Sequence, residues 1–371
     1  MKPNQLKRNV RVILCLLIYS CNSDHVSQID NPEGPLAALW EYKYDFYGWG
    51  SRATPELVGD SLIFITGDKY ITCLYTDSGV VKWQFPVPGG HESLMRNILH
   101  SEFQLFGWQL GAQDQLYSLD IVTGQLQWTI DSVGYWERHG LGPNYYSPYK
   151  TSAYKIAFSG QVLDTVTSDH YFDSMSYYDG KVFACFGWSP DNNPKSIGRI
   201  ICYDEQSMNP LWTKEESNGS LALCYPIYEN GIMYVGTIWG VNDRTVAIDV
   251  ETGQTIWSND NYGAYKLLLV GDTLYREVSS SVFAMDKNTG ADLWRTNLSN
   301  PDESPTLCYC DGYLYVENYG TLYILDAETG EIVHTMIGPD DAGVEKVSAG
   351  VGTIYVQTTQ HLYAMSPYDP N

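Results

Sequence analysis

The stretch from Tyr323 to Gly338, YILDAETGEIVHTMIG, reads as a β-strand, a tight turn and a second strand. Similar stretches begin at Tyr117, YSLDIVTGQLQWTIDS, and at Val246, VAIDVETGQTIWSND. An Asp side chain can accept hydrogen bonds from backbone N–H groups two and three residues further on, and Gly supplies the positive φ that closes such a hairpin. The recurring order Asp-x-x-Thr-Gly therefore predicts a hairpin that the chain repeats.

A Trp stands four residues after the turn glycine in the complete copies of this pattern. The turn residues are Asp120 and Gly124, Asp249 and Gly253, Asp286 and Gly290, and, in the quoted stretch, Asp326 and Gly330. The equivalent second-strand positions are Trp40, Trp83, Trp128, Trp212, Trp257, Trp294 and His334. Because His334 stands where the other copies carry Trp, we interpret it as a weakened junction between repeats rather than as a functional histidine.

Two further strands are expected before each turn. The segment CDGYLYVENYG, from Cys310, shows a Gly-containing turn followed by alternating aromatic and aliphatic residues, which is a strand signature. Similar segments precede the other turns, so the repeating unit has four strands.

The spacing of the second-strand positions gives the number of repeats. Neighbouring positions lie roughly 42 residues apart, as in propeller repeats, but Trp128 and Trp212 are separated by 84. The segment YKIAFSGQVLDTVTS, from Tyr154, contains a degenerate copy in this gap, with Asp164 at the Trp position. This count predicts eight repeats; the alternative is seven repeats with an insertion at 133–172.

The two ends of the chain complement each other. Trp40 has no turn before it, and the last repeat ends at SPYDPN without a fourth strand. The segment LAALWEYKYD, from Leu36, would supply that strand, and closing a ring in this way removes exposed sheet edges. The predicted fold is all-β: an eight-bladed β-propeller of four-stranded antiparallel blades at 36–371, closed by an N-terminal strand that completes the last blade.

At these residues the chain resembles the quinoprotein (PQQ-like) propeller repeat, whose pattern is Ala-x-Asp-x-x-Thr-Gly-x-x-x-Trp. Ala247-Ile248-Asp249 and Ala284-Met285-Asp286 match it most fully, and the spacing recurs over nearly all of the chain after the N-terminal segment. The resemblance implies that the Trp side chains dock between neighbouring blades and are structural. A WD40 propeller fits less well, because no Trp-Asp pair occurs.

The family also contains dehydrogenases, which hold a quinone under an adjacent Cys pair and bind Ca²⁺. This chain has no adjacent Cys pair, its nearest approach being Cys308-Tyr309-Cys310, and no Cys-x-x-Cys-His haem motif. We therefore expect no catalytic residues, no bound metal and no cofactor, PQQ included. A quinone-dependent dehydrogenase is kept as a second alternative. Cys185 and Cys202 are expected in one blade, either as a disulfide or as buried thiols.

The N-terminal residues form a separate segment. A basic start, with Lys2, Lys7, Arg8 and Arg11, precedes an apolar run that is too short to span a bilayer and fits a secretory signal. Ile18-Tyr19-Ser20-Cys21 resembles a bacterial lipobox. We expect a signal peptide at 1–20, lipidation at Cys21 and a polar tether within 21–35, or else an ordinary secretory signal cut nearby. The protein would then be exported and anchored to the bacterial outer membrane, facing the periplasm or the surface.

The charge of the chain bears on its partners. The formal net charge is −22, and removal of the signal would leave 18 Lys and Arg residues against 44 Asp and Glu, near −26. Such a field repels nucleic acid and anionic headgroups. Nucleic acid is therefore excluded as a partner, the membrane is expected to be reached only through the lipid anchor, and the protein is expected to be a monomer.

A candidate binding face follows from the tryptophans that do not dock between blades. In a propeller, the loops between the second and third strands and the loops between blades emerge on one face, and the spare tryptophans fall there. The candidate residues are Trp49, Trp108, Trp136, Glu137, Arg138, His139, Trp188, Asp191, Asn192, Trp239, Asn242 and Arg244. Aromatic groups ringed by polar ones are typical of binding sites, although these Trp side chains would equally well pack long loops onto the blades. His139 is either a ligand or acid, or a solvated loop histidine.

The shorter members of the resembled family are binding scaffolds, including a lipoprotein of the machinery that assembles outer-membrane β-barrels. The resemblance therefore implies a non-catalytic envelope lipoprotein that binds protein, with outer-membrane protein assembly as its process. A surface lipoprotein that binds glycan is the alternative, with sugar rings stacked on the Trp side chains.

Overall fold

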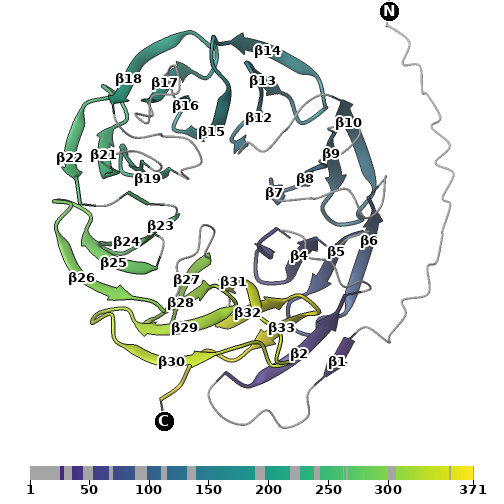
Figure 1. Cartoon of the computed structure of the whole chain (residues 1–371). Helices are drawn as coiled ribbons and strands as arrows, with labels where there is room; N and C mark the ends of the chain where they lie inside the picture. The colour runs from purple at the N-terminus through teal and green to yellow at the C-terminus, as the bar shows by residue number, and fades with distance from the viewer. Residues whose placement is uncertain are drawn as a thin grey trace, which may run out of the picture.

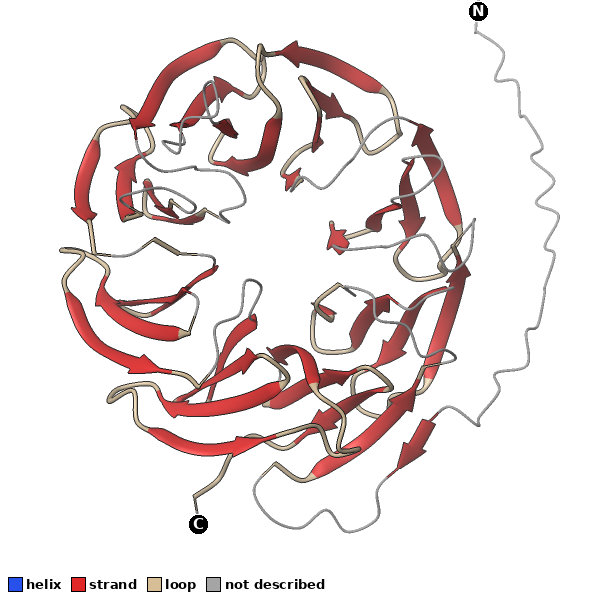
Figure 2. Ribbon diagram, in the orientation of Figure 1, coloured by secondary structure: helices blue, strands red, loops and turns tan. Residues whose placement is uncertain are grey.

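Strands arranged around a central axis make up the protein, as the computed structural model shows (Figures 1 and 2). The structure describes residues 26–28, 36–44, 53–66, 70–87, 98–109, 115–131, 139–188, 197–217, 226–237, 243–261, 263–264, 266–278, 280–299, 306–350 and 352–370. No helix long and apolar enough to cross a membrane occurs within these ranges.

The strands form eight sheets, each antiparallel, and these are the eight predicted blades. We label the strands of a blade A to D from the axis outward. Blades 1 to 4 contain β3 (Glu56–Val58), β4 (Leu62–Thr66), β5 (Tyr70–Tyr75) and β6 (Val81–Pro86); β7 (Ile98–His100), β8 (Gln104–Gln109), β9 (Gln115–Asp120) and β10 (Leu126–Asp131); β11 (Gly140–Leu141), β12 (Tyr145–Tyr149), β13 (Ser152–Ile156) and β14 (Val162–Thr167); and β15 (Phe172–Tyr178), β16 (Lys181–Trp188), β17 (Ile197–Asp204) and β18 (Pro210–Ser217).

Blades 5 to 8 follow in the same order. They contain β19 (Ile227–Glu229), β20 (Ile232–Gly236), β21 (Thr245–Asp249) and β22 (Thr255–Asn259); β23 (Lys266–Val270), β24 (Thr273–Val278), β25 (Ser281–Asp286) and β26 (Asp292–Asn297); β27 (Thr306–Cys310), β28 (Tyr313–Asn318), β29 (Thr321–Asp326) and β30 (Ile332–Met336); and β31 (Val344–Gly350), β32 (Thr353–Thr358) and β33 (His361–Met365), completed by β2 (Ala38–Lys43).

The ring closes as the sequence predicts. Strand β2 pairs antiparallel with β33 and so provides the D strand of blade 8. A fifth strand, β1 (Val26–Gln28), pairs with β2 on its outer side, within the segment expected to be a tether. Strands β11 to β14 form a complete blade inside 133–172, so the seven-bladed alternative is wrong.

Every D strand enters its sheet through the same irregularity. In blade 5, Trp257 lies opposite Ala247, and Thr255 lies opposite Ile248, so one residue of the D strand is skipped. The other seven C–D pairs show the same shift. The register therefore places Asp164 and His334 at positions equivalent to the six tryptophans.

The turns between C and D strands are held by their own side chains. The Asp249 carboxylate accepts hydrogen bonds from the Thr252 backbone N (2.8 Å) and hydroxyl (2.7 Å), and Gly253 has a φ of 71°. Asp120, Asp286 and Asp326 make the same pair of bonds. Hydrogen bonds to the charged form lower the pKa of Asp249, that from the Thr252 hydroxyl contributing most.

Six blade junctions share one contact, in which a Trp ring of one blade covers the turn glycine of the next. The indole N–H of Trp212 donates to the Val250 carbonyl (3.0 Å), and a Cβ on Gly253 would lie 2.7 Å from the ring. The pairs are Trp40 and Gly79, Trp83 and Gly124, Trp128 and Gly160, Trp212 and Gly253, Trp257 and Gly290, and Trp294 and Gly330. Glycine is needed here both for the positive φ and to admit the ring.

A second position changes with the Trp. The residue opposite each of the six tryptophans on the C strand is small: Ala364, Cys73, Ser118, Cys202, Ala247 and Ala284. Asp164 and His334 instead face Lys155 and Ile324. Directly opposite residues share one face of the sheet, so a large ring requires a small neighbour.

The junction between blades 3 and 4 has no Trp and uses different contacts. Met208 takes the place of the turn glycine, with a φ of 50°, and its side chain is buried. The Lys155 ammonium lies 2.9 Å from the Glu205 carboxylate, which also accepts bonds from the Tyr146 hydroxyl and the Asn144 amide, each 2.8 Å long. A buried, hydrogen-bonded ion pair thus replaces the Trp.

The junction between blades 7 and 8 is also different, because the C and D strands of blade 8 come from opposite ends of the chain and share no turn. The His334 ring stacks on Tyr368 of the C-terminal segment, with ring centroids 5.9 Å apart. His334 therefore packs against the end of the chain.

The described cysteines are thiols. Cys185 lies opposite Ile200 and Cys202 lies opposite Phe183, so the two are out of register for a disulfide, and neither forms one. Burial raises the pKa of Cys202 to about 12.

Candidate functional site

The propeller has two faces of different make-up. The B–C connections and the connections between blades leave from one face, the loop face, whereas the A–B and C–D turns form the other, the turn face. Trp108 and Trp188 lie near the loop-face ends of β8 and β16, and their side chains are outside the described residues. The remaining loop-face candidates outside the described residues are Trp49, Trp136, Glu137, Arg138, Asp191, Asn192, Trp239 and Asn242.

Two of the candidates are described. His139 is only 8% exposed, and its ring lies 5.4 Å from that of Tyr145. Burial lowers the pKa of His139 to about 3, so the imidazole is neutral at physiological pH. The solvated loop histidine expected from the sequence is wrong, because His139 directly precedes β11 and packs inside the blade. Arg244 is half-buried, and its backbone exchanges two 2.8 Å hydrogen bonds with Thr237.

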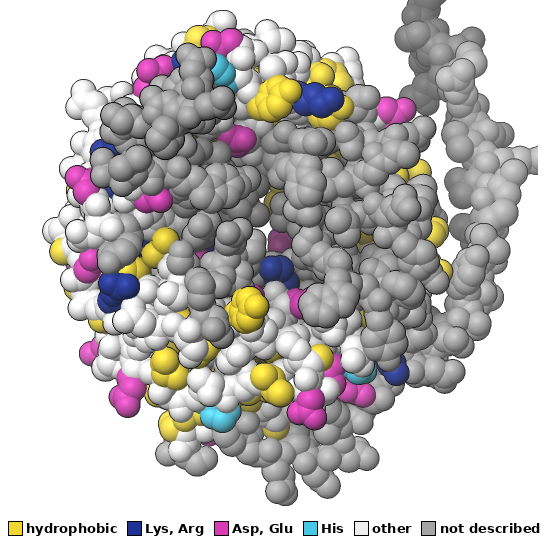
Figure 3. Space-filling view, in the orientation of Figure 1, with side chains coloured by type: hydrophobic (Ala, Val, Ile, Leu, Met, Phe, Trp, Pro, Cys, Tyr) yellow, Lys and Arg dark blue, Asp and Glu magenta, His cyan; other side chains and the backbone are white. Residues whose placement is uncertain are grey.

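Charged side chains line the inner strands near the axis, where the space-filling view is hollowed (Figure 3). The imidazole of His100 on β7 lies 3.5 Å from the Glu56 carboxylate on β3. Burial raises the pKa of Glu56 to about 7, although the charge of Lys266 acts in the opposite direction. In the described part of the chain, no three His, Cys, Asp or Glu side chains gather as a metal site would require.

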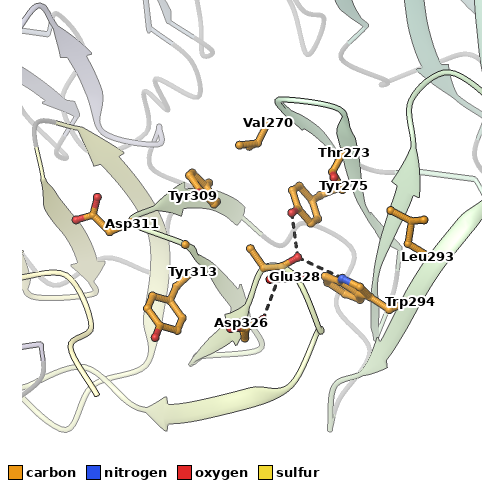
Figure 4. A pocket seen from close by; sticks show the side chains of 12 residues that line it. Val270, Thr273, Tyr275, Leu293, Trp294, Tyr309, Asp311, Tyr313, Asp326 and Glu328 are labelled. Atoms are coloured by element: carbon orange, nitrogen blue, oxygen red, sulfur yellow. Dashed lines mark hydrogen bonds between the residues drawn. The ribbon is translucent and has the colours of Figure 1, made fainter. Parts of the chain in front are cut away.

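A cavity opens on the turn face between blades 6 and 7, with a volume of about 510 Å³. Figure 4 shows that its walls come from both blades: Val270, Thr273, Tyr275, Leu293 and Trp294 from blade 6, and Tyr309, Asp311, Tyr313, Asp326 and Glu328 from blade 7. We call this the 6/7 pocket.

The floor of the 6/7 pocket is rigidly bonded. The Tyr275 hydroxyl and the Trp294 indole N–H both donate to the Ala327 carbonyl, at 3.0 and 3.2 Å. The Asp326 carboxylate is already engaged with its own turn, and hydrogen bonds from the Thr329 backbone and hydroxyl lower its pKa. The fixed part of the site is therefore the Trp-on-glycine junction itself.

The upper part of the pocket is open to solvent. Tyr309 is 37% exposed and Leu293 58% exposed, and the side chains of Asp311 and Glu328 are exposed. No Lys or Arg is among the residues that line the cavity. Aromatic faces beside carboxylates are the groups with which proteins bind cations.

The 6/7 pocket contains none of the spare tryptophans, and no catalytic or metal-binding motif marks it in the sequence. The residues of the pocket are ordinary members of the repeat. The feature of the sequence that could have indicated the pocket is the first residue of each B strand, which differs from blade to blade.

Comparisons with known proteins agree with this architecture. A family model described as "Outer membrane protein assembly factor BamB" matches residues 278–369. BamB from Moraxella catarrhalis superposes with a TM-score of 0.67 at 14% identity, over 89% of this chain and 99% of that one. The computationally designed protein Ika8 gives a TM-score of 0.67 at 13% identity, over 87% and 98% of the two chains.

A curated relative is similar over a shorter region. The serine/threonine-protein kinase AfsK of Streptomyces griseus is 25% identical over 182 residues, which is 45% of this chain and 22% of the kinase. This chain therefore matches about a fifth of the length of that protein. Taken together, the chain is a β-propeller whose fold is similar to that of BamB and whose residues 278–369 match the BamB family model.

Proposed function

We propose that the protein is a non-catalytic scaffold of the bacterial envelope, anchored by a lipid on Cys21, which binds partner proteins at its loop face. The observation that supports this proposal is that the recurring residues of the repeat hold the fold together. The side chains of each Asp-x-x-Thr-Gly turn hold a hairpin, and six tryptophans pack between neighbouring blades. What remains for function is a rigid ring that presents two surfaces.

The resemblance to BamB supports the finer parts of the proposal. The name of that protein places it in outer-membrane protein assembly, and the signal peptide and lipobox expected at the N-terminus of this chain would fit the same compartment. We propose outer-membrane protein assembly as the process. The five tryptophans outside the docking positions provide the anchoring side chains that protein interfaces favour.

A pull-down from envelope extract tests the binding role. We expect the full-length, membrane-anchored protein to capture one or a few envelope proteins, and the Trp49→Ser/Trp136→Ser/Trp239→Ser variant to lose them at an unchanged unfolding midpoint. A matched control replaces two exposed apolar residues at the starts of D strands, Leu211→Ser and Ile256→Ser, and should keep the partners.

Two outcomes would contradict the proposal. One is an equal yield of the same partners with the triple Trp variant. The other is retention of the wild type on polysaccharide gels with no protein captured, which would favour a glycan ligand. The anchor is tested separately, since a Cys21→Ser variant should leave the membrane fraction.

A further inference from the structure

Three successive blade junctions near the turn face are each closed by a lysine of the protein itself. Between blades 3 and 4, Lys155 pairs with Glu205 at 2.9 Å. Between blades 4 and 5, Lys181 pairs with Glu251 at 2.6 Å.

Between blades 5 and 6, Lys287 of blade 6 pairs with Glu229 of blade 5 at 2.6 Å, and it also pairs with Asp272 of its own blade at 3.1 Å. The next junction, between blades 6 and 7, is where the 6/7 pocket opens.

The register shows which residues of blades 4 and 6 are equivalent. Lys181 opens the B strand of blade 4 opposite Asp204, and Thr273 opens the B strand of blade 6 opposite Asp286. Each of these carboxylates begins a C–D turn, so Thr273 stands where blade 4 has its lysine.

The glutamate that pairs with Lys181 at the junction of blades 4 and 5 has a counterpart at the junction of blades 6 and 7. Glu251 is the second residue after Asp249, and Glu328 is the second residue after Asp326. Among the residues that the structure describes, the Glu328 side chain forms no ion pair.

A second replacement enlarges the space. The A strand of blade 4 ends at Tyr178, opposite Lys181, whereas that of blade 6 ends at Val270, opposite Thr273. Tyr178 stacks on Tyr228 of blade 5, with centroids 5.0 Å apart and ring planes 12° apart. The counterpart of Tyr228 is Tyr309, whose ring lines the cavity, because Val270 stands where blade 4 has Tyr178.

A charge is also added at the mouth of the pocket. The A–B turn of blade 5 contains Asn230, and the same position in blade 7 is Asp311; both have positive φ, 49° and 47°. The 6/7 pocket therefore has one carboxylate more than the closed junction and one lysine fewer.

We propose that the 6/7 pocket binds a lysine side chain presented by a partner polypeptide. The ammonium group would lie between the carboxylates of Glu328 and Asp311, and the alkyl stem would lie along Tyr309 and Leu293. This arrangement reproduces, with a lysine from outside, the contact that Lys181 makes within the chain. The proposal rests on the proposed binding role but concerns the opposite face, so the two can fail separately.

The probe is the capped tripeptide acetyl-Ala-Lys-Ala-amide, titrated into the folded protein and followed by saturation-transfer NMR. A single side chain should bind weakly, with a Kd on the order of 1 mM. The same tripeptide with Nε-acetyl-lysine keeps the stem and loses the charge, and it should bind at least tenfold more weakly.

Two variants place the interaction. Thr273→Lys supplies the missing lysine within the chain and should weaken peptide binding at least tenfold. Glu328→Gln keeps the shape of an exposed side chain and removes its charge, with a similar loss expected. The matched control is Thr353→Lys, which adds the same charge at the start of the B strand of blade 8 and should leave binding unchanged.

The proposal is overturned if the acetyl-lysine peptide binds as well as the lysine peptide, or if no saturation transfer is seen from the lysine peptide at about ten times the expected Kd. It is also overturned if both Thr273→Lys and Glu328→Gln bind like the wild type. Should Thr273→Lys fail to fold, Glu328→Gln alone decides. The triple Trp variant of the loop face should retain peptide binding whatever the pull-down shows.

Discussion

The junction between blades 4 and 5 and the junction between blades 6 and 7 are built on the same frame. In each, a Trp ring covers the turn glycine of the next blade and its indole N–H donates to a backbone carbonyl of the same turn: Trp212 over Gly253, and Trp294 over Gly330. In each, a glutamate stands at the second position after the turn aspartate. We call this shared set of contacts the frame; it is the same in both junctions although different residues cover it.

The two junctions differ in the residues that cover the frame. Tyr178 and Lys181 fill the first, whereas Val270 and Thr273 leave the second open. A few residues per blade therefore hold the ring together, and the residues beside them can differ from blade to blade and form a binding surface. Predictions that change the frame should affect both junctions alike, and predictions that change the cover should separate them.

The largest loss of stability is expected from substitutions of the tryptophans in the frame. Trp212→Ala and Trp294→Ala should each lower the free energy of unfolding by about 3–5 kcal/mol, because each removes a packed ring and its hydrogen bond. Urea unfolding followed by circular dichroism measures both. His334→Ala, at an equivalent position without a Trp, serves as the control with the smaller expected loss. A large loss for one Trp and none for the other would break the equivalence of the two junctions.

The junction without Trp between blades 3 and 4 gives the next effect. Glu205→Gln should cost about 3 kcal/mol at neutral pH, because it leaves the buried Lys155 charge without its partner. Burial alone would raise the pKa of Glu205, but hydrogen bonds from Lys155, Tyr146 and Asn144 hold it below the ordinary value of 4.5.

A carboxylate with a lowered pKa in the folded state contributes stability that is present above its unfolded pKa and is lost as pH falls through the folded value. The difference between wild type and Glu205→Gln should therefore shrink on acidification from pH 7 to below the unfolded value of 4.5. Unfolding curves at a series of pH values check this, and a constant difference would contradict the account of this junction.

A smaller effect is expected at the turn glycine. Gly253→Ala should cost about 2–4 kcal/mol, since the new Cβ collides with the Trp212 ring in addition to the strained φ. Gly271→Ala is the matched control: its φ is also positive, 56°, but nothing lies within 4 Å of an added Cβ. It should cost about 1–2 kcal/mol. Thermal unfolding of both variants isolates the ring contact, and equal losses would argue against it.

The smallest loss of stability is expected from substitutions of the residues that cover the frame. Glu251 is largely exposed, so Lys181→Ala should cost less than about 1 kcal/mol, as surface ion pairs do. A loss comparable to that of Trp212→Ala would mean that the lysine belongs to the frame, and the comparison with Thr273 would then lose its basis.

Most of the fold could be predicted from the sequence because the frame has a strict spacing. The equivalence of Asp164 and His334 with the tryptophans follows from the distance between a turn glycine and the residue four positions later. The blade count follows from the spacing between these positions, and the closing strand follows from the missing fourth strand of the last repeat. The short strand β1 was not predicted, since three residues carry no detectable period.

The candidate site was harder to predict for a physical reason. His139 was expected in an exposed loop, yet three-dimensional packing against Tyr145 buries it. The 6/7 pocket depends on Val270 and Thr273 being smaller than residues almost a hundred positions earlier. That difference has a meaning only once the strand register has placed Lys181 and Thr273 at the same point of their blades.

The central claim is that the 6/7 pocket is a lysine site which the chain leaves open. The most direct measurement uses a lysine tripeptide carrying a photoreactive side chain next to the lysine, with the cross-linked residues mapped by mass spectrometry. The account predicts labelling around Leu293 and between Tyr309 and Tyr313, and loss of that labelling in Val270→Tyr/Thr273→Lys, which rebuilds the closed junction of blades 4 and 5. Labelling elsewhere on the ring, or unchanged labelling in the double variant, would contradict it.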